Sequence, residues 1–388
     1  MKILMLHNRY QITSGEEVVV KTELDLLKSK GHDVSLLEAN NEEISGFVGK
    51  AKAAIDAIYS ISSKQQLSQA ISSIQPDIVH VHNFFPLLSP SIYYACQAAN
   101  VPVVQTLHNY RLLCASASFF RDGNVCEDCL GKRFPWPGII HACYRDSKLG
   151  TAVVASMQSM HTLAGTWSNQ VSSYIALTDF ARNKFIEGGL PAHKIAVKPN
   201  FLNVDPGKGE GKGNYALFAG RLWPEKGVET LLTAWEQIGA RLPLKILGDG
   251  PLADQVIEAT NQNSGVQWLK QQPRETVIDL MKNATVLVLP STWYEGFPMS
   301  IVEAYAVGLP VIASKIGSMS SLIKHEQTGL HFHPGDSEDL VTQIEWVLEH
   351  PAQLAQMRQA ARSEFEMNYS ADQNFQILMD IYQTAISK

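Results

Sequence analysis

The chain has 388 residues, a formal net charge of -6 and a mean hydropathy of -0.07. This length exceeds that of one ordinary hydrophobic core, so we expect two domains of about 150–200 residues each. The negative charge gives no indication of nucleic-acid binding, and no apolar run approaches the roughly 18 residues that cross a bilayer. The start, MKILMLHNRY, is typical of a buried strand rather than a signal peptide, which favours a cytoplasmic protein.

Strands and helices alternate along the first half of the chain. We expect buried strands near residues 2–6, 33–37, 76–82, 102–107, 174–178 and 195–201, with helices near 17–30, 43–59, 64–74, 89–99, 150–170 and 179–188. This alternation indicates a parallel, doubly wound α/β sheet, whose ligands bind at the carboxyl ends of the strands. His82 and His108 occupy such positions, and for His82 a structural role and a functional role are both open.

Residues 111–150 interrupt the alternation and form an insertion in which cysteines gather. They are Cys114, Cys126, Cys129 and Cys143. The CEDC segment has the Cys-x2-Cys spacing of a zinc knuckle, so one interpretation is a structural zinc held by four thiolates. The other is that the cysteines are small apolar fillers of a packed surface insertion. The spacing leaves both interpretations open.

A run of aromatic and basic residues, KRFPWPGII at 132–140, belongs to the same insertion. Aromatic rings beside cations are typical of segments that contact a membrane interface, although this run is too short for an amphipathic anchor. One expectation is therefore a peripheral contact with a membrane or with a lipid-linked acceptor. Ordinary surface packing is the alternative.

A glycine-rich segment without apolar residues, PGKGEGKG at 206–213, divides the chain. Such a composition is typical of a linker, which we place at 205–214, between a first domain at 1–204 and a second at 215–370. The second domain restarts the alternation, with strands near 215–220, 244–247 and 286–289. Three helices are expected to end the chain, near 337–349, 351–367 and 371–386.

The stretch from 285 to 314 has the order strand, turn, helix, strand. Its apolar run at 286–289 is expected to be a buried strand, and Pro298 the first residue of a helix that ends at Gly308. The N-terminus of this helix therefore opens at the carboxyl end of a strand. Unpaired N–H groups and the helix dipole both favour phosphate at such a point.

Two carboxylates flank this helix start with the spacing Glu-x7-Glu, Glu295 before the helix and Glu303 within it. Acidic groups repel phosphate, so they need another role in a phosphate site. Sugar hydroxyls and a ribose diol supply that role, because each carboxylate accepts two hydrogen bonds from them. Two solvated acids on a helix are the alternative interpretation.

At these residues the chain resembles the retaining, nucleotide-sugar-dependent glycosyltransferases of the glycogen-synthase-like family, the family 4 type. The resemblance implies the GT-B fold, in which two Rossmann-like α/β domains face each other across a cleft. It also implies that a last helix, at 371–388, crosses back to the first domain. The similarity spans nearly the whole chain; it is strongest in 215–335 and weakest in 1–60 and in the cysteine insertion.

Roles for individual residues follow from the resemblance. Glu303 holds the ribose, and Glu295 faces the donor sugar. Arg221 and Lys226, in the segment GRLWPEKG, clamp the donor diphosphate, which suits a guanidinium and an ammonium at the end of a strand. His108, in TLHNYR, faces the sugar. The implied donor-binding set is Gly15, Arg221, Lys226, Glu295, Gly296, Phe297, Pro298, Met299, Ser300 and Glu303.

Catalysis is assigned on the same basis to His108, Glu295, Arg221 and Lys226. No Asp-x-Asp motif occurs, so we expect transfer without a metal, with the two cations and the helix N-terminus stabilising the leaving diphosphate. Gly15 lies in the first strand-to-helix turn, where an ordinary tight turn is an equal alternative. The retaining mechanism, with attack on the same face, rests on the resemblance.

The resulting hypothesis is a retaining hexosyltransferase in the cytoplasm, at the inner face of the membrane. It would move a sugar from a nucleoside-diphosphate sugar, its co-substrate, to a saccharide or lipid-linked saccharide in cell-surface polysaccharide or glycolipid synthesis, and would require no cofactor for catalysis. One alternative is a nucleotide-sugar epimerase or hydrolase of the same fold, which should carry acid–base groups in the first domain instead of the Glu-x7-Glu clamp. Another is a non-catalytic sugar-nucleotide binder, which the intact clamp disfavours.

Overall fold

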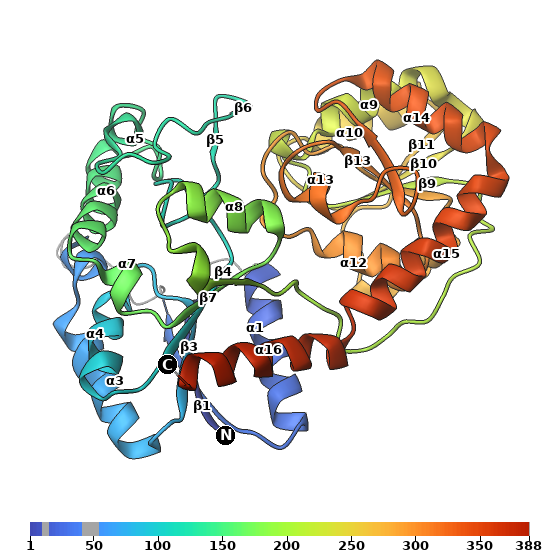
Figure 1. Cartoon of the computed structure of the whole chain (residues 1–388). Helices are drawn as coiled ribbons and strands as arrows, with labels where there is room; N and C mark the ends of the chain where they lie inside the picture. Colours follow the sequence, from blue (N-terminus) through green and yellow to red (C-terminus); the bar gives the residue numbers. More distant parts are fainter. Residues whose placement is uncertain (10–14, 41–53, 388) are drawn as a thin grey trace. The chain divides into compact units, whose positions relative to one another are not determined.

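The computed structural model describes residues 1–9, 15–40 and 54–387. The chain folds as two compact units, each built on its own six-stranded parallel sheet, which confirms the predicted α/β class (Figure 1). Unit 1 comprises Met1–Phe119, Cys126–Pro199 and Asn374–Lys388, and unit 2 comprises Phe120–Val125 and Asn200–Gln373. In the described part of the chain, no helix combines the length and the apolar character that crossing a membrane requires.

The sheet of unit 1 has the strand order β2-β1-β3-β4-β7-β8. Its strands are β1 (Lys2–Arg9), β2 (Asp33–Asn40), β3 (Ile78–Asn83), β4 (Val103–Leu107), β7 (Ser173–Ala176) and β8 (Ile195–Val197). The strand order reverses between β1 and β3. In sheets of this kind, ligands bind beyond the carboxyl ends of the strands at the reversal.

Helices connect these strands, as the sequence predicts. They are α1 (Gly15–Ser29), α3 (Ile61–Ile74), α4 (Ser91–Ala98), α5 (Trp136–Ile140), α6 (Lys148–Leu163), α7 (Thr166–Asn169) and α8 (Asp179–Glu187), with a 3-10 turn at Ala192–Lys194. The helix expected at 43–59 lies largely outside the described residues, which resume at 54 and are helical at 54–58. The single helix expected at 150–170 is two helices, because Gly165 adopts a φ of 68° between α6 and α7.

The last helix of the chain, α16 (Ala371–Ile386), packs against the sheet of unit 1, which confirms the predicted crossover (Figure 1). Its buried side chains, among them Leu378 and Tyr382, join a core that contains Ile3 and Met5 of β1. Each such buried apolar side chain contributes roughly 1.5–3 kcal/mol. The first and last segments of the chain therefore stabilise one core.

The sheet of unit 2 has the strand order β11-β10-β9-β12-β13-β14, the order of a Rossmann sheet, and reverses between β9 and β12. Its strands are β9 (Ala216–Ala219), β10 (Leu244–Leu247), β11 (Val266–Trp268), β12 (Val286–Leu289), β13 (Val311–Ser314) and β14 (Gly329–Phe332). Its helices are α9 (Val228–Ile238), α10 (Ala253–Gln262), α11 (Arg274–Asn283), α12 (Met299–Ala306), α13 (Gly317–Leu322), α14 (Ser337–Glu349) and α15 (Pro351–Asn368), with 3-10 turns η3 (Pro224–Lys226) and η4 (Gly239–Arg241). Helices α14, α15 and α16 match the three predicted at the end of the chain.

The glycine-rich segment expected to be a linker is bound to unit 2. The N–H of Gly209 donates to Val307 O at 2.9 Å, and that of Gly211 donates to Lys282 O at 2.9 Å. A Cβ atom on Gly209 would lie only 2.3 Å from Lys282 O. The glycines therefore permit close backbone packing, which composition alone does not distinguish from flexibility, and the boundary between the units falls at Pro199.

Cys114, Cys126 and Cys143 lie near enough to Cys129 to affect its pKa. All five cysteines of the chain are free thiols. Burial raises the pKa of the Cys129 thiol to about 11, and the neighbouring Cys114, Cys143 and Cys126 raise it further. The insertion also contains the hairpin β5 (Phe120–Arg121) and β6 (Asn124–Val125), which belongs to unit 2.

The four thiols do not form a ready-made metal site, so the zinc hypothesis stays a prediction. Among the described residues, the one group of three candidate ligands whose ligand atoms lie within 4.8 Å of one another is a Glu-His-His set without cysteine. Zinc–sulfur bonds of about 2.3 Å would therefore have to draw the four thiols closer together. Their common neighbourhood around Cys129 fits that rearrangement.

If the four thiols bind a structural zinc, the purified protein should contain about one zinc per chain, measured by plasma mass spectrometry. Cys126→Ser should lose this zinc, because a structural site needs all four ligands. The control is Cys96→Ala, since Cys96 is fully buried in α4 and lies outside the group. Purified wild-type protein without zinc would leave the cysteines as apolar fillers.

Candidate functional site

Three predicted site residues follow β9 and β12, the two strands between which the strand order of unit 2 reverses. Arg221 and Lys226 come after β9, and Glu295 comes after β12. Because the carboxyl ends of parallel strands meet at one edge of a sheet, the two loops lie together. The predicted phosphate-binding helix, α12, begins at the same edge with Met299.

Lys226 and Glu295 form a partly buried ion pair. The Lys226 ammonium donates to Oε1 of Glu295 at 2.7 Å, and the hydroxyl of Ser291 donates to the same oxygen at 2.7 Å. Glu295 is only 7% exposed. Burial alone would raise the pKa of this carboxyl group, but Lys226 and the hydrogen-bond donors around it outweigh burial and lower it. Glu295 is therefore ionised at neutral pH.

Gly227 explains how Lys226 reaches this carboxylate. Its φ is 70°, and a Cβ atom on it would lie 1.9 Å from the carbonyl oxygen of Pro290, at the end of β12. The loop after β9 therefore presses directly against the strand that leads to Glu295. A hydrogen bond from Thr292 N to Glu225 O, at 2.9 Å, joins the same two loops. The Lys-Gly pair in the sequence thus has a steric cause.

Arg221 precedes Lys226 in the same loop and is far more accessible. Its side chain is 58% exposed, and its Nη2 atom lies 4.0 Å from Oε1 of Glu225. The guanidinium also lies 5.2 Å from the ring centroid of Trp223. An exposed ion pair of this length contributes little, so the guanidinium remains free to bind an anion bidentately.

The start of α12 has the features of an anion site. Pro298 is the N-cap rather than the first helical residue, and no side chain caps the helix. The residues from Gly296 to Ser300 are partly exposed, and Ser318 Oγ donates to Gly296 O at 3.1 Å, which holds the turn against α13. The N–H groups of a first turn without a side-chain cap are suited to bind phosphate.

Glu303 has a partner that the sequence analysis missed. Nη2 of Arg274, at the start of α11, lies 3.1 Å from its Oε1. Burial raises the pKa of Glu303, and Arg274 offsets only part of that effect. A cation in the first turn of a helix opposes the helix dipole, so the position of Arg274 was a usable signal.

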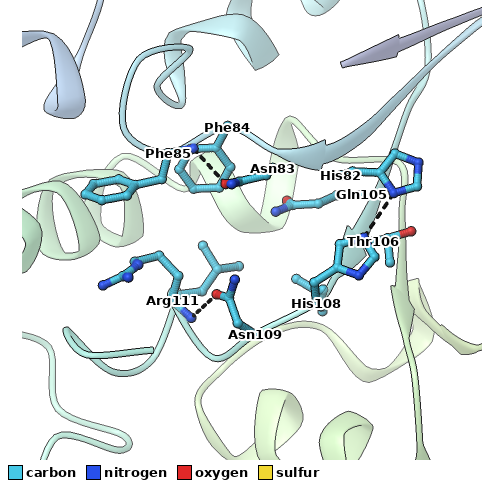
Figure 2. A pocket seen from close by; sticks show the side chains of 11 residues that line it. His82, Asn83, Phe84, Phe85, Gln105, Thr106, His108, Asn109 and Arg111 are labelled. Carbon is cyan, nitrogen blue, oxygen red and sulfur yellow. Dashed lines mark hydrogen bonds between the residues drawn. The ribbon is translucent and has the colours of Figure 1, made fainter. Parts of the chain in front are cut away.

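In unit 1, His108 follows β4 and lies beside His82 of β3 (Figure 2). Nδ1 of His82 and Nε2 of His108 are 3.0 Å apart, so one nitrogen donates a hydrogen bond to the other. Both rings line a small cavity of about 20 Å³, together with Asn109 and Arg111. That volume holds about one water molecule or one hydroxyl group. The structure thus brings together the two histidines that the sequence singled out separately.

Gly15 is the first residue of α1, which follows β1 in unit 1. A Cβ atom on it would meet nothing within 4 Å, so the described surroundings impose no steric need for glycine. Residues 10–14 of the same turn lie outside the described part of the chain. Gly15 and the predicted catalytic residue His108 belong to unit 1, whereas the predicted donor-binding residues other than Gly15 belong to unit 2.

Two family models match the chain in adjoining regions. The model Glycosyltransferase Family 4 matches residues 13–206, and the model Glycosyl transferases group 1 matches residues 204–364. The first of these regions is half of the 388 residues. The second contains the whole Arg221-to-Glu303 site.

Curated relatives align over much of the chain. Glycogen synthase of Mycobacterium tuberculosis is 24% identical over 303 residues, which cover 76% of this chain and 66% of that protein. The D-inositol 3-phosphate glycosyltransferase of Rhodococcus erythropolis is 28% identical over 241 residues, which cover 59% of this chain and 51% of that protein. The chain therefore spans between half and two thirds of the length of these relatives.

Solved structures match over the full length. HepE of Anabaena, in complex with UDP, has a TM-score of 0.71 at 18% identity and covers 100% of both chains. Sucrose-phosphate synthase of Thermosynechococcus elongatus has a TM-score of 0.70 at 16% identity, and covers 100% of this chain and 99% of that one. At such identities the likeness shows the fold. From the matched family model and this fold, the chain belongs to the family 4 glycosyltransferases and has the GT-B fold.

Proposed function

We propose that the protein is a retaining glycosyltransferase whose unit 2 binds a nucleoside-diphosphate sugar. The observation that carries this proposal is the ionised Glu295, held by Lys226 beside the uncapped start of α12 at the reversal of a Rossmann sheet. Such a site offers cations and N–H groups to a diphosphate and a carboxylate to hydroxyl groups. The HepE structures, which contain UDP alone or UDP and glucose, support a nucleotide donor and a hexose.

The diphosphate would contact Arg221, Lys226 and the first N–H groups of α12. Arg221 is exposed, and Lys226 has further ammonium protons to donate beyond the one on Glu295. These donors would stabilise the negative charge that builds on the leaving diphosphate. With no Asp-x-Asp motif in the sequence to hold a divalent ion, they would do so without a metal.

Glu303 and Glu295 would bind hydroxyl groups of the donor. Glu303 is mostly buried one turn into α12, and it would accept hydrogen bonds from the ribose diol. Glu295 precedes the helix and would face the sugar, as would His108 of unit 1. The preceding turn, Gly296 to Pro298, leads directly from the sugar carboxylate to the phosphate-binding amides.

Transfer would pass through an oxocarbenium-like transition state. The family resemblance favours attack on the face from which the diphosphate leaves, with a phosphate oxygen taking the proton of the acceptor hydroxyl. The sugar would then keep its anomeric configuration. Both matched family models are glycosyltransferases, which disfavours the epimerase or hydrolase alternative.

The acceptor would be a saccharide or a lipid-linked saccharide, as in polysaccharide or glycolipid synthesis. The run at 132–140 supports a lipid-linked acceptor and a peripheral membrane contact, because it exposes Phe134, Trp136 and Ile140 beside the exposed Lys132 and Arg133. Exposed aromatic rings next to cations suit the interface of an anionic membrane. Such a contact would place the enzyme at the cytoplasmic face.

The ribose assignment is tested by comparing a nucleoside diphosphate with its 2′,3′-dideoxy analogue, using the base that binds best among UDP, GDP and ADP. Glu303→Ala should weaken the ribose form by about 10- to 100-fold, because a charge-assisted hydrogen bond contributes about 1.5–3 kcal/mol. Glu303→Ala should hardly change the affinity for the dideoxy form, since the contact is already missing there. Calorimetry gives both affinities.

The neighbouring Glu275→Gln is the matched control for that experiment, because Glu275 is an exposed acid on α11. It should leave both affinities unchanged. Equal losses for the ribose and the dideoxy ligand in Glu303→Ala would reject the ribose assignment and point to the freed Arg274 instead.

Transfer should survive excess EDTA, whereas Lys226→Ala should lower the turnover number by about 10²-fold, as the loss of a preorganised donor does. Lys212→Ala provides the control, since Lys212 is exposed and pairs with Glu210 away from the site. The measurement is the initial rate of nucleoside-diphosphate release. A rate that EDTA abolishes and Mg²⁺ or Mn²⁺ restores would contradict a metal-free mechanism.

A further inference from the structure

A fully buried group of charged and titratable side chains lies in unit 1, behind His108. Glu23 of α1 and Lys198, which follows β8, are each only 1% exposed, and the Lys198 ammonium donates to Oε2 of Glu23 at 2.8 Å. Oε1 of Glu23 lies 3.1 Å from Nδ1 of His80 and 3.2 Å from Nε2 of His82. Burial of so many ionisable groups is costly, so their arrangement requires a reason.

Metal binding does not supply that reason, although Glu23, His80 and His82 have ligand atoms within 4.8 Å of one another. The carboxylate already has a cation, Lys198, in contact. Both ring nitrogens of His80 are also engaged, Nδ1 with the hydroxyl of Tyr382 at 2.7 Å and Nε2 with that of Thr106 at 2.8 Å. A second cation would have to displace these partners. The group is therefore a network of side chains.

The Glu23–Lys198 ion pair brings two buried charges of opposite sign into this network. Burial alone would raise the pKa of Glu23, but Lys198 and the neighbouring His80 hold it well below its usual range. Burial lowers the pKa of His82 to about 4, with smaller contributions from His80 and Lys198, so this ring is neutral at pH 7. Burial also lowers the pKa of His108, and His82, His7 and His80 lower it further.

A neutral imidazole carries one proton, and its neighbours decide which nitrogen holds it. An ionised carboxylate only accepts, so the contact with Glu23 favours the proton on Nε2 of His82. The contact between Nε2 of His82 and Oε1 of Glu23 does not have the geometry of a regular hydrogen bond. Among the described residues, however, no other acceptor forms a hydrogen bond with Nε2 of His82. Nδ1 of His82 is then an acceptor, and Nε2 of His108, 3.0 Å away, must be the donor.

We propose that Glu23, acting through His82, fixes His108 in the Nε2–H tautomer, so that the unprotonated Nδ1 of His108 accepts a hydrogen bond from a sugar hydroxyl group. Glu23 and His82 are positioning residues, and Lys198 balances the carboxylate so that both rings stay neutral. The cavity beside the two rings has room for about one hydroxyl group. The identity of the hydroxyl-bearing ligand rests on the proposed function, whereas the tautomers do not.

The tautomers of His82 and His108 can be read directly from ¹⁵N–¹³C correlation spectra of the ligand-free, histidine-labelled protein at neutral pH. Single His→Gln variants assign the signals. We expect both residues in the Nε2–H form. An Nδ1–H form or an imidazolium at either residue would overturn the proposal. This measurement needs neither a substrate nor an activity.

A double variant, Glu23→Gln with Lys198→Met, tests the positioning role. Glu23→Gln alone would leave the Lys198 charge buried without its partner, so both charges are removed together. An amide presents either an acceptor or a donor to His82, so the tautomers should become mixed. The turnover number should fall by about tenfold, the effect of one lost hydrogen bond, with a smaller change in KM.

Glu364→Gln is the matched control, because Glu364 is also a buried carboxylate in an ion pair, with Lys324 in unit 2. It should change neither the histidine signals nor turnover. Unchanged tautomers in the double variant, or mixed tautomers with unchanged turnover, would overturn the positioning role. Predicted tautomers in a protein that transfers no sugar would count against the proposed function and not against Glu23. If the double variant does not fold, the wild-type spectra still show whether His82 and His108 have the proposed tautomers.

Discussion

The donor site of unit 2 depends on one interaction, the ion pair between Lys226 and Glu295. A buried carboxylate is strongly unfavourable without a counter-charge, and Lys226 supplies that charge at 2.7 Å. The loops that carry the two residues meet because Gly227 lets the backbone approach Pro290. When a diphosphate binds, the same ammonium must be shared between Glu295 and the phosphate oxygens. The pair thus stabilises the buried carboxylate before the ligand arrives, and a bound diphosphate competes with Glu295 for the ammonium.

A buried carboxylate also needs a counter-charge in unit 1, where Glu23 pairs with Lys198. There, Glu23 and Lys198 are completely buried, and the remaining polar atoms around them are supplied by histidines and by the last helix of the chain. Asn374 of α16 accepts from the Lys198 ammonium at 3.0 Å, and Tyr382 of α16 contacts His80. The crossover helix therefore completes a polar network as well as an apolar core. Loss of this helix would leave polar groups of the network without hydrogen-bond partners and would expose the apolar core.

Several parts of the structure follow directly from sequence patterns. The structure contains the strand expected from the apolar run at 286–289 and a helix between the proline at 298 and the glycine at 308. These elements could be predicted because each signal is local. For the same reason, His108 could be placed at the end of a strand, Glu295 before a helix and Glu303 within that helix. The reversal of strand order between β9 and β12 depends on pairing between distant segments, so no local pattern predicts it.

Other features required tertiary information. The glycine-rich segment near Gly209 has the composition of a flexible linker, and only its contact with Lys282 shows that it is packed. Arg274 of α11 lies close to Glu303 of α12 because the two helices pack against each other, and not through their spacing in the chain. Glu23 does fall on the buried side of α1, between Val19 and Leu27, so an acid on an apolar face was a signal that could have been used.

The central claim, that Lys226 is a phosphate-binding cation for which Glu295 and the diphosphate compete, is tested most directly by the affinity of Glu295→Gln for the bare nucleoside diphosphate. Removing the carboxylate charge frees the ammonium and removes a repulsion. Calorimetry should therefore show binding that is tighter than in the wild type, by up to about tenfold or 1.4 kcal/mol, even though sugar transfer is lost. A diphosphate affinity that falls in Glu295→Gln would contradict the account, because Glu295 would then contribute to diphosphate binding itself.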